Sequence, residues 1–295
     1  MTDQKIYDFI IAGSGIAGNV CAFLLAKKNK SCLILEKHPC RAEKICGGGF
    51  SHKALKLLAE IGIDVAGMKL LEHKDIFGHV KFFPESITEK VYDGGKVSLG
   101  IQRRLSDEFL LQQALSVGAE IFYGVPVSTV KVVGKISRVN ERYSAKNFVV
   151  ATGASGLLKK NPRGQSFGLS VLIKGFSRLA SDKFYFWYDD DSGDKYCWLF
   201  PVGAELWNAG IWQKIPDLQM SKNFSAWLEK ITREYFPKNF AYASKIRGSY
   251  LGNIDQRDNE LFSNGLGDFA GRNNILNGGG IIGAIESAIE FSQKI

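Results

Sequence analysis

Residues 6–18 read IYDFIIAGSGIAG, and this stretch decides the fold. Its first half is β-branched and aromatic, which suits a strand buried in a parallel sheet. Its second half places three glycines at the spacing of a GxGxxG turn, and residues 19–30, NVCAFLLAKKNK, have helical composition. Residues 31–36, SCLILE, predict a second strand, so the segment forms a βαβ unit.

Each glycine of this turn has a mechanical reason. Gly13 permits the tight turn, Gly15 lets a pyrophosphate approach the backbone, and Gly18 lets the helix pack closely on the strand. The start of the helix offers free N–H groups and positive potential to the phosphates. Glu36 follows 23 residues after Gly13, where a carboxylate accepts hydrogen bonds from ribose hydroxyls and disfavours a 2′-phosphate. The motif predicts NAD or FAD and does not separate the two.

The composition indicates a globular protein. Of 295 residues, 45% are hydrophobic and 23% are charged, which excludes wholesale disorder. The net charge of +8 fits an anionic partner or simply a solvated basic surface, and no nucleic-acid-binding motif is present.

The five cysteines lack a disulfide-framework spacing, and the four histidines lack metal-site spacing, so we expect reduced thiols and no metal. We also expect neither a signal peptide nor a membrane-spanning helix.

Three later segments favour FAD. They read FVVATG (148–153), GLGDFAG (265–271) and GGGIIGA (278–284), the last opening an amphipathic helix. In this order they resemble the flavoprotein monooxygenase and reductase superfamily. The resemblance implies that Gly267 and Asp268 contact the ribityl and pyrophosphate region of FAD. It also implies that the glycine-rich helix start, Gly278 to Ile281, faces the flavin ring, where a helix N-terminus stabilises negative charge.

Two more motifs narrow this resemblance to geranylgeranyl reductases and their relatives. KICGGGF (44–50) resembles their Lys-Pro-Cys-Gly-Gly loop, and YCWLFP (196–201) resembles their Tyr-x-Trp-x-Phe-Pro strand. Arg103, four residues before Asp107, matches the arginine of their R-x-x-x-D helix start, which touches FAD. The chain is therefore identified as a geranylgeranyl reductase-like FAD-dependent oxidoreductase.

The sequence departs from that pattern in three places. Ile45 replaces the proline before the cysteine, and residues 208–211 read Asn-Ala-Gly-Ile where the family keeps a glycine pair. The sequence ends at Ile295, just after the flavin-facing helix, so it resembles a short form that lacks the usual C-terminal extension. We expect a more open pocket, and the identity of the substrate does not carry over.

Three side chains are the catalytic candidates. By resemblance, Cys46 lies near the flavin as a proton donor or as part of the pocket's shape; the alternative is a small buried hydrophobe. Tyr196 and Trp198 fall on one strand face, where by resemblance they line the substrate cavity beside the flavin. A tyrosine hydroxyl there orients substrate or passes a proton, and the alternative for this pair is ordinary sheet packing.

The residues expected to bind the cofactor come from every motif above. They are Gly13, Gly15, Ile16, Ala17, Gly18, Glu36, Lys37, Gly47, Gly48, Arg103, Pro126, Val127, Thr152, Gly153, Gly267, Asp268, Gly279, Gly280 and Ile281.

The expected fold class is α/β: a discontinuous Rossmann-like FAD-binding domain of the GR2 type with an inserted antiparallel-sheet substrate domain. The FAD-binding domain gathers residues 1–75, 96–156 and 247–295. The substrate domain gathers residues 76–95 and 157–246. Its strands are expected at LSVLIKGF, KFYFWYDD, YCWLFPVG and LWNAGIWQ, with a covering helix at NFSAWLEKITREYF.

The leading functional hypothesis is an FAD-dependent reductase of C=C bonds in an apolar, isoprenoid-like substrate. One alternative is an FAD-dependent monooxygenase or halogenase-like enzyme, although the lysine that halogenases need cannot be located. Another is a flavin-binding protein with reduced catalysis. We expect a small apolar substrate, no nucleic acid, and an external electron donor, either NAD(P)H or a ferredoxin-like protein. A cytoplasmic location is expected, and peripheral contact with the inner membrane face and oligomerisation stay open.

Overall fold

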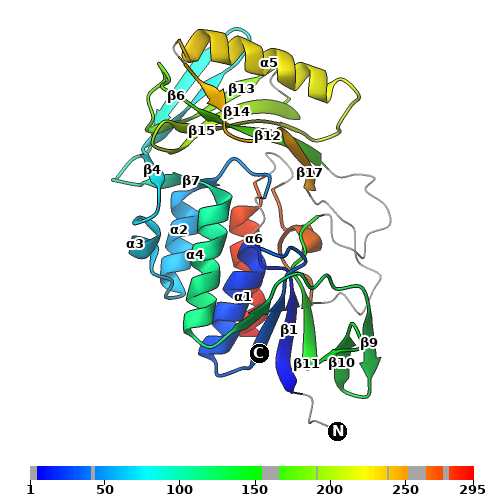
Figure 1. Ribbon diagram of the computed structural model, residues 1–295. Coiled ribbons are helices and arrows are strands. Elements are labelled where there is room, and N and C mark those ends of the chain that lie inside the picture. The colour runs from blue at the N-terminus through cyan, green and yellow to red at the C-terminus, as the bar shows by residue number, and fades with distance from the viewer. Residues whose placement is uncertain are drawn as a thin grey trace.

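The computed structural model describes residues 5–40, 44–154, 166–190, 192–237, 239–251, 264–274 and 279–295. Gly278 and the expected domain boundary at 156/157 lie outside the described residues. Figure 1 shows two stacked parts: a lower part in which helices pack on one sheet, and an upper part formed by a second sheet under a long helix.

The first sheet contains the βαβ unit predicted from the glycine motif. β1 (Ile6–Ala12) lies between β2 (Cys32–Leu35) and β11 (Tyr143–Val150), and it is parallel to both. β8 (Glu120–Phe122) extends the parallel side, and β10 (Ile136–Val139) and β9 (Val130–Val133) add an antiparallel arm. The strand order is β8-β2-β1-β11-β10-β9. β9 and β10 form a hairpin that turns at Gly134.

Four helices form a layer beside this sheet (Figure 1). They are α1 (Ile16–Lys27), α2 (His52–Glu60), α4 (Arg103–Ser116) and α6 (Ile281–Gln293); the short α3 (Val65–Met68) follows α2. α4 begins at Arg103, with Gln102 as its N-cap, so the helix start expected at Arg103 is confirmed. Ten of the twelve residues of α1 are buried between sheet and helices, so its apolar composition reflects burial on most sides.

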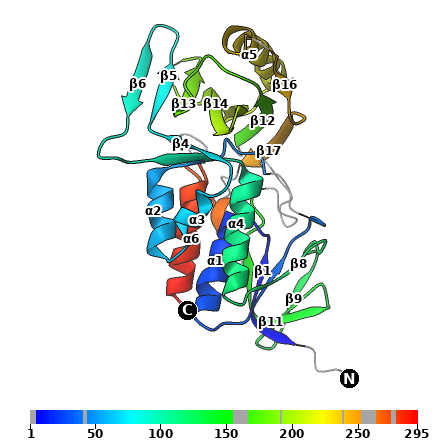
Figure 2. The same ribbon diagram turned by 60° about the vertical axis from the view of Figure 1, so that its left-hand side comes forward.

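The second sheet contains all four strands predicted for the substrate domain: β12 (Ser166–Lys174), β13 (Lys183–Tyr188), β14 (Lys195–Gly203) and β15 (Leu206–Gln213). These strands pair antiparallel in the order β12-β15-β14-β13. β5 (Gly78–Phe82) pairs parallel with β13, so the sheet is mixed and the prediction of a purely antiparallel sheet is wrong at this edge. β6 (Ile87–Val91) continues β5 as a projecting hairpin, visible in Figure 2.

The opposite edge of this sheet holds β16 (Ala241–Tyr242) and β17 (Arg247–Leu251), which both pair with β12. The segment from residue 247, assigned by prediction to the FAD-binding part, therefore starts within the second sheet. A small sheet of β3 (Gly49–Phe50), β7 (Ser98–Ile101) and β4 (His73–Ile76) lies between the two parts. β7 packs closely on β14, because a Cβ on Gly100 would lie 1.9 Å from the carbonyl oxygen of Pro201.

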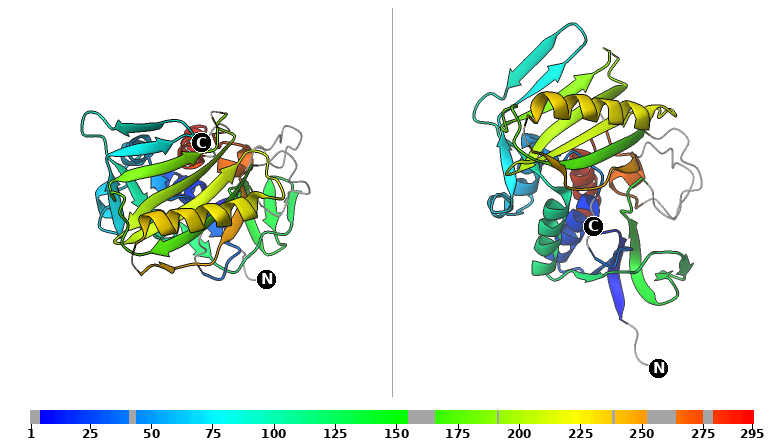
Figure 3. Two further views of the ribbon diagram at one scale, coloured as in Figure 1. Left: turned by 90° about the horizontal axis from the view of Figure 1, so that it is seen from above. Right: turned by 45° about the horizontal axis from the view of Figure 1, so that its top comes forward.

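The two faces of the second sheet differ. One face packs on α5 (Met220–Tyr235), which lies across the strands in Figure 3 and buries Phe224, Leu228 and Ile231 against them. Side chains alternate along a strand, so the next residues point the other way, toward the lower part. That second face is aromatic: Phe184, Phe186 and Tyr188 on β13, and Tyr196, Trp198 and Phe200 on β14.

Candidate functional site

The GxGxxG turn has the geometry that its glycines were expected to allow. Gly13 has φ +104°, and a Cβ there would lie 2.6 Å from the carbonyl oxygen of Ala151. A Cβ on Gly18 would lie 2.0 Å from the carbonyl oxygen of Gly13. Nothing lies within 4 Å of a Cβ built on Gly15, which borders open space. Two glycines therefore shape the turn, and the third leaves room for a ligand.

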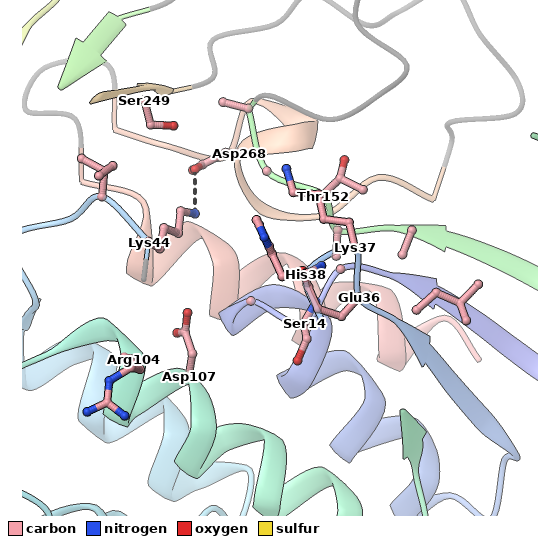
Figure 4. Close-up of a pocket in the computed structure, with 18 of the residues that line it drawn as sticks. Ser14, Glu36, Lys37, His38, Lys44, Arg104, Asp107, Thr152, Ser249 and Asp268 are labelled. Atoms are coloured by element: carbon pink, nitrogen blue, oxygen red, sulfur yellow. Dashed lines mark hydrogen bonds and ion pairs between the residues drawn. The ribbon is translucent and has the colours of Figure 1, made fainter. Parts of the chain in front are cut away.

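A cavity of about 610 Å³ opens at the carboxyl ends of β1, β2 and β11. Figure 4 shows Glu36, Lys37 and His38 after β2, Arg104 and Asp107 on α4, and Ser249 on β17 around this cavity. The volume lies in the usual range for sites that enclose a small molecule or cofactor. Lys37, Lys44, Arg104 and Arg247 bring positive charge to its walls. The carboxyl edge of a parallel sheet is where α/β folds bind nucleotides.

Two features of the cavity wall match a dinucleotide. Glu36 accepts hydrogen bonds from the backbone N–H of Ser14 (2.9 Å) and of His38 (3.0 Å), so its carboxylate is held at the cavity wall. Thr152 Oγ1 is buried and has no hydrogen-bond partner within the described part of the chain. A buried hydroxyl without a partner is costly, and a ligand hydroxyl or phosphate would satisfy it. The residues present therefore fit the nucleotide half of FAD.

A buried asparagine that the sequence reasoning missed ties the turn to α4. Asn19 is fully buried on α1, accepts from Ser14 Oγ (2.9 Å) and donates through Nδ2 to the carbonyl oxygen of Asp107 (2.9 Å). Asparagine in the middle of an apolar helix is unusual, because a buried amide needs partners. That mismatch in NVCAFLLA was the signal that could have identified it.

Lys44 was also missed, although it opens the quoted KICGGGF loop. Lys44 Nζ lies 3.2 Å from Asp268 Oδ2, the pair joined by a dashed line in Figure 4. Lys44 lines the large cavity and also a second cavity of about 60 Å³ that lies toward α6. Both residues of this ion pair line both cavities, so the pair lies where the two spaces adjoin.

The smaller cavity ends at the start of α6. Gly280 and Ile281 line it together with Gly267 and Asp268. A Cβ on Gly280 would lie 2.7 Å from Asp268 Oδ1, so the Asp268 carboxylate rests against the helix N-terminus, where the helix dipole stabilises negative charge. Gly267 has φ +58°, and its N–H donates to Ser287 Oγ (3.0 Å) on α6. These contacts fix the Gly-Asp pair and the helix start as one unit.

Arg103 and Cys46 also line this cavity. Arg103 is buried and bonds Asp107 with both Nε (3.1 Å) and Nη2 (2.8 Å). Burial opposes the guanidinium charge, but Asp107 and Cys46 offset it and raise the pKa of Arg103 above its ordinary value. A permanent positive charge is thus held beside the Cys46 sulfur.

Tyr196 and Trp198 do not line either of these cavities in the described residues; they lie on the aromatic face of the second sheet above the 44–48 loop. A Cβ on Gly47 would lie 2.7 Å from the Phe200 ring and 3.1 Å from Trp198 Nε1. Burial, together with Tyr188 and Cys46, raises the pKa of the Tyr196 hydroxyl. Tyr196 therefore stays neutral at physiological pH.

The other predicted cofactor residues divide into two groups. Those that line a described cavity are Gly13, Gly15, Ile16, Ala17, Glu36, Lys37, Arg103, Val127, Thr152, Gly153, Gly267, Asp268, Gly280 and Ile281. Gly18, Gly47, Gly48, Pro126 and Gly279 do not line these cavities. Gly48 has φ +78°, and its carbonyl accepts from Ile101, while Pro126 O accepts from Asn140 Nδ2. These residues shape the segments next to those that line the cavities.

The chain is similar to known proteins over nearly its whole length. Residues 11–51 match the family model of an NAD(P)-binding Rossmann-like domain. The chain is 24% identical to digeranylgeranylglycerophospholipid reductase 1 of Methanococcoides burtonii, over 98% of this chain and 74% of that protein.

Two solved structures are similar throughout. A geranylgeranyl bacteriochlorophyll reductase-like protein from Thermoplasma acidophilum has a TM-score of 0.75 at 20% identity, covering 98% of this chain and 78% of that one. A flavin-dependent brominase has a TM-score of 0.76 at 17% identity, with coverages of 98% and 79%. The predicted α/β fold class, the resemblance to geranylgeranyl reductase-like oxidoreductases and the choice of FAD are confirmed by these likenesses.

Proposed function

We propose that this chain is an FAD-dependent reductase that adds two hydrogens across a C=C bond of an apolar, isoprenoid-like substrate. The observation that carries the proposal is that the 44–48 loop lines the cavities beside the α6 helix start on one side and packs on the aromatic face of the second sheet on the other. The sequence likeness to a digeranylgeranylglycerophospholipid reductase supports the substrate class. When bound and reduced, FAD would supply the hydride equivalent.

The chain's own residues would supply position and a proton. Gly13, Gly15 and the α1 N-terminus bind the pyrophosphate, and Glu36 binds the ribose. Asp268 binds the ribityl region at the start of α6. These roles follow the motif chemistry and the cavity lining. The aromatic face excludes water from an apolar chain and orients it, because large aromatic surfaces bury well against hydrocarbon.

Two groups could deliver the proton that completes the reduction. The Tyr196 hydroxyl is neutral because burial raises its pKa, and the Cys46 thiol lies at the cavity wall beside Arg103. In the balanced reaction, one alkene carbon receives a hydride and the other receives a proton from one of these groups, which is then reprotonated from water. We assign the proton to Tyr196, because its neutral hydroxyl lies on the aromatic face that packs on the 44–48 loop.

The test begins with the absorbance spectrum of the protein reconstituted with FAD. Anaerobic reduction with dithionite, followed by a prenyl alcohol or prenyl phospholipid, should reoxidise the flavin and give a product two mass units heavier. A spectrum that shows no bound flavin at FAD concentrations well above micromolar would overturn the proposal. Tyr196→Phe should slow the reoxidation while leaving FAD affinity unchanged.

The second candidate is an oxygen-using halogenase-like enzyme, favoured by the likeness to a flavin-dependent brominase. The two functions differ in what reoxidises the reduced flavin. Reoxidation that requires air and is insensitive to prenyl compounds, with halide incorporated into an aromatic acceptor, would favour this candidate. Reoxidation by the alkene without oxygen would exclude it.

Peripheral membrane contact, self-association and the electron donor also stay proposals. Among the described residues, no helix is long and apolar enough to cross a bilayer. The β16 edge exposes Phe240 and Tyr242, with Lys174 paired opposite Ala241 on the neighbouring strand. Flotation with anionic vesicles, compared with neutral vesicles, tests membrane contact. Light scattering tests self-association, and flavin reduction by NADH, NADPH or a reduced ferredoxin tests the donor.

A further inference from the structure

Asn208 on β15 bridges two segments that are far apart in the sequence. Its Oδ1 accepts from Trp198 Nε1 at 2.8 Å, and its Nδ2 donates to the carbonyl oxygen of Cys46 at 3.0 Å. The amide orientation is fixed by chemistry, because an indole N–H only donates and a peptide carbonyl only accepts. One side chain therefore joins the aromatic strand β14 to the loop at residues 44–48.

The hydrogen bonds made by Asn208 lie in buried, closely packed surroundings. Asn208 is 9% exposed and Trp198 is 6% exposed. The Trp198 indole covers Gly210, where a Cβ would lie 2.0 Å from the ring. The Asn208 amide can hardly exchange its partners for water, so loss of either bond leaves a buried polar atom unpaired.

The position of the Cys46 peptide decides the position of the Cys46 sulfur. Cys46 lines the smaller cavity together with the start of α6, and it lies beside Arg103 and Tyr196. Gly48 N–H also donates weakly to Cys46 Sγ at 3.5 Å. A shift of the carbonyl would move the sulfur relative to all three neighbours, and would change the wall on which a flavin ring rests.

We propose that Asn208 is a positioning residue that holds the Cys46 loop at its correct distance from the flavin ring by linking it to Trp198. The inference rests on the proposed function, because it assumes that the ring binds beside Cys46.

The decisive variant is Asn208→Asp. The ionised carboxylate still accepts from Trp198, but it cannot donate to the Cys46 carbonyl and repels it. When protonated, the introduced carboxyl has one donor and one acceptor again and so reproduces the amide. Burial favours this neutral form and brings its titration above the ordinary Asp range. The defect should therefore appear at high pH and disappear at low pH.

The expected result is a change in FAD affinity and in the flavin absorbance and circular dichroism bands. At about pH 8 the variant should bind FAD roughly tenfold more weakly than the unchanged protein, and near pH 5 the difference should fall to within about twofold. The variant and the unchanged protein are compared at the same pH, so titration of Cys46, Arg103 and Tyr196 contributes to both. Asn223→Asp, an exposed position on α5, is the matched charge control and should show no difference at either pH.

Trp198→Phe provides the second measurement if Asn208→Asp folds poorly. It removes the indole donor and leaves the bond from Asn208 to Cys46, so its effect on the flavin bands should be smaller and independent of pH. The alkylation rate of Cys46, read from the mass of its peptide, should change in Asn208→Asp even without FAD.

The outcomes distinguish a failure of the proposed function from a failure of the Asn208 bridge. If the unchanged protein binds no FAD, the proposed function fails, and the Cys46 alkylation rate still tests the bridge. If FAD binds but Asn208→Asp matches the unchanged protein in affinity, spectrum and alkylation, Asn208 does not position the loop. A defect of equal size at both pH values would mean that packing, not the donated hydrogen bond, matters at this position.

Discussion

At the carboxyl ends of β1, β2 and β11 the site is made mainly of main chain, whereas under the second sheet it is made of large side chains. In the first region the decisive atoms are the carbonyl oxygens and N–H groups around Gly13, Gly15 and Gly18. In the second they are the aromatic rings of β13 and β14 and the Asn208 amide. In the backbone region an added side chain collides with main-chain atoms or fills the space left for a ligand. In the aromatic region a substitution can change one side-chain group and leave the main chain in place.

The largest expected effect comes from a side chain in the backbone region. We expect Gly15→Val to abolish FAD binding, because its side chain would fill the space of the pyrophosphate. The position is open without ligand, so the unfolding temperature of the apoprotein should change little. Isothermal titration with FAD and differential scanning calorimetry measure the two quantities.

Gly18→Ala is the contrasting variant. Its Cβ would meet the Gly13 carbonyl oxygen at 2.0 Å, so the turn itself must shift. We expect a loss of about 1–3 kcal/mol in the free energy of unfolding, as for other overpacked positions. If Gly15→Val is destabilised and Gly18→Ala is not, the roles assigned to the two glycines are reversed.

Asp268→Ala probes the junction between the two regions. The substitution removes a carboxylate that rests against the α6 N-terminus and that is expected to accept from a flavin-side hydroxyl. Loss of a charge-assisted hydrogen bond of roughly 1.5–3 kcal/mol corresponds to about ten- to a hundredfold weaker FAD binding. Fluorescence quenching of FAD gives the dissociation constant, and an unchanged value would reject this role.

Lys44→Gln should have a smaller effect that depends on salt. Lys44 now pairs with Asp268, and a dianionic pyrophosphate nearby would attract the same ammonium group. Because the Lys44 side chain is 41% exposed, salt screens this attraction, and we expect FAD affinity to fall only about three- to tenfold at low salt. The salt dependence of FAD binding should also become shallower. Equal slopes for both proteins would mean that Lys44 does not face the phosphates; Lys37→Gln is the comparison at the far end of the cavity.

The smallest expected effect concerns Tyr196 in the aromatic region. Burial, then Tyr188 and Cys46, raise the pKa of its hydroxyl, so the folded state favours the protonated form. The stability that this provides is fully present below the ordinary tyrosine pKa of about 10 and is lost as pH rises above that value, since the unfolded chain then releases the proton more readily. Denaturant unfolding between neutral and strongly alkaline pH should show a shallower decline for Tyr196→Phe than for the unchanged protein.

Much of the fold was predictable because its signals are local. The βαβ unit follows from the apolar run at 6–12 and the glycine spacing, and four strands of the second sheet follow from their alternation. The parallel pairing of β5 with β13 was not predictable, because two strands of similar composition carry no mark of their relative direction. The burial of Arg103 beside Cys46 was not predictable either, because helix-start signals do not include tertiary partners.

The sequence by itself determined the chemistry of the site: three glycines and a glutamate for a dinucleotide, a Gly-Asp pair before a glycine-rich helix, and an aromatic strand. Only the tertiary structure decided how these parts meet. Lys44 pairs with Asp268 where the two cavities adjoin, Asn19 links the GxGxxG turn to α4, and Asn208 joins β14 to the Cys46 loop. Each of these contacts links two residues that lie between 88 and 224 positions apart in the sequence. Local propensity and spacing act over a few residues, so bonds of this kind are fixed only when the folded chain brings their two ends together.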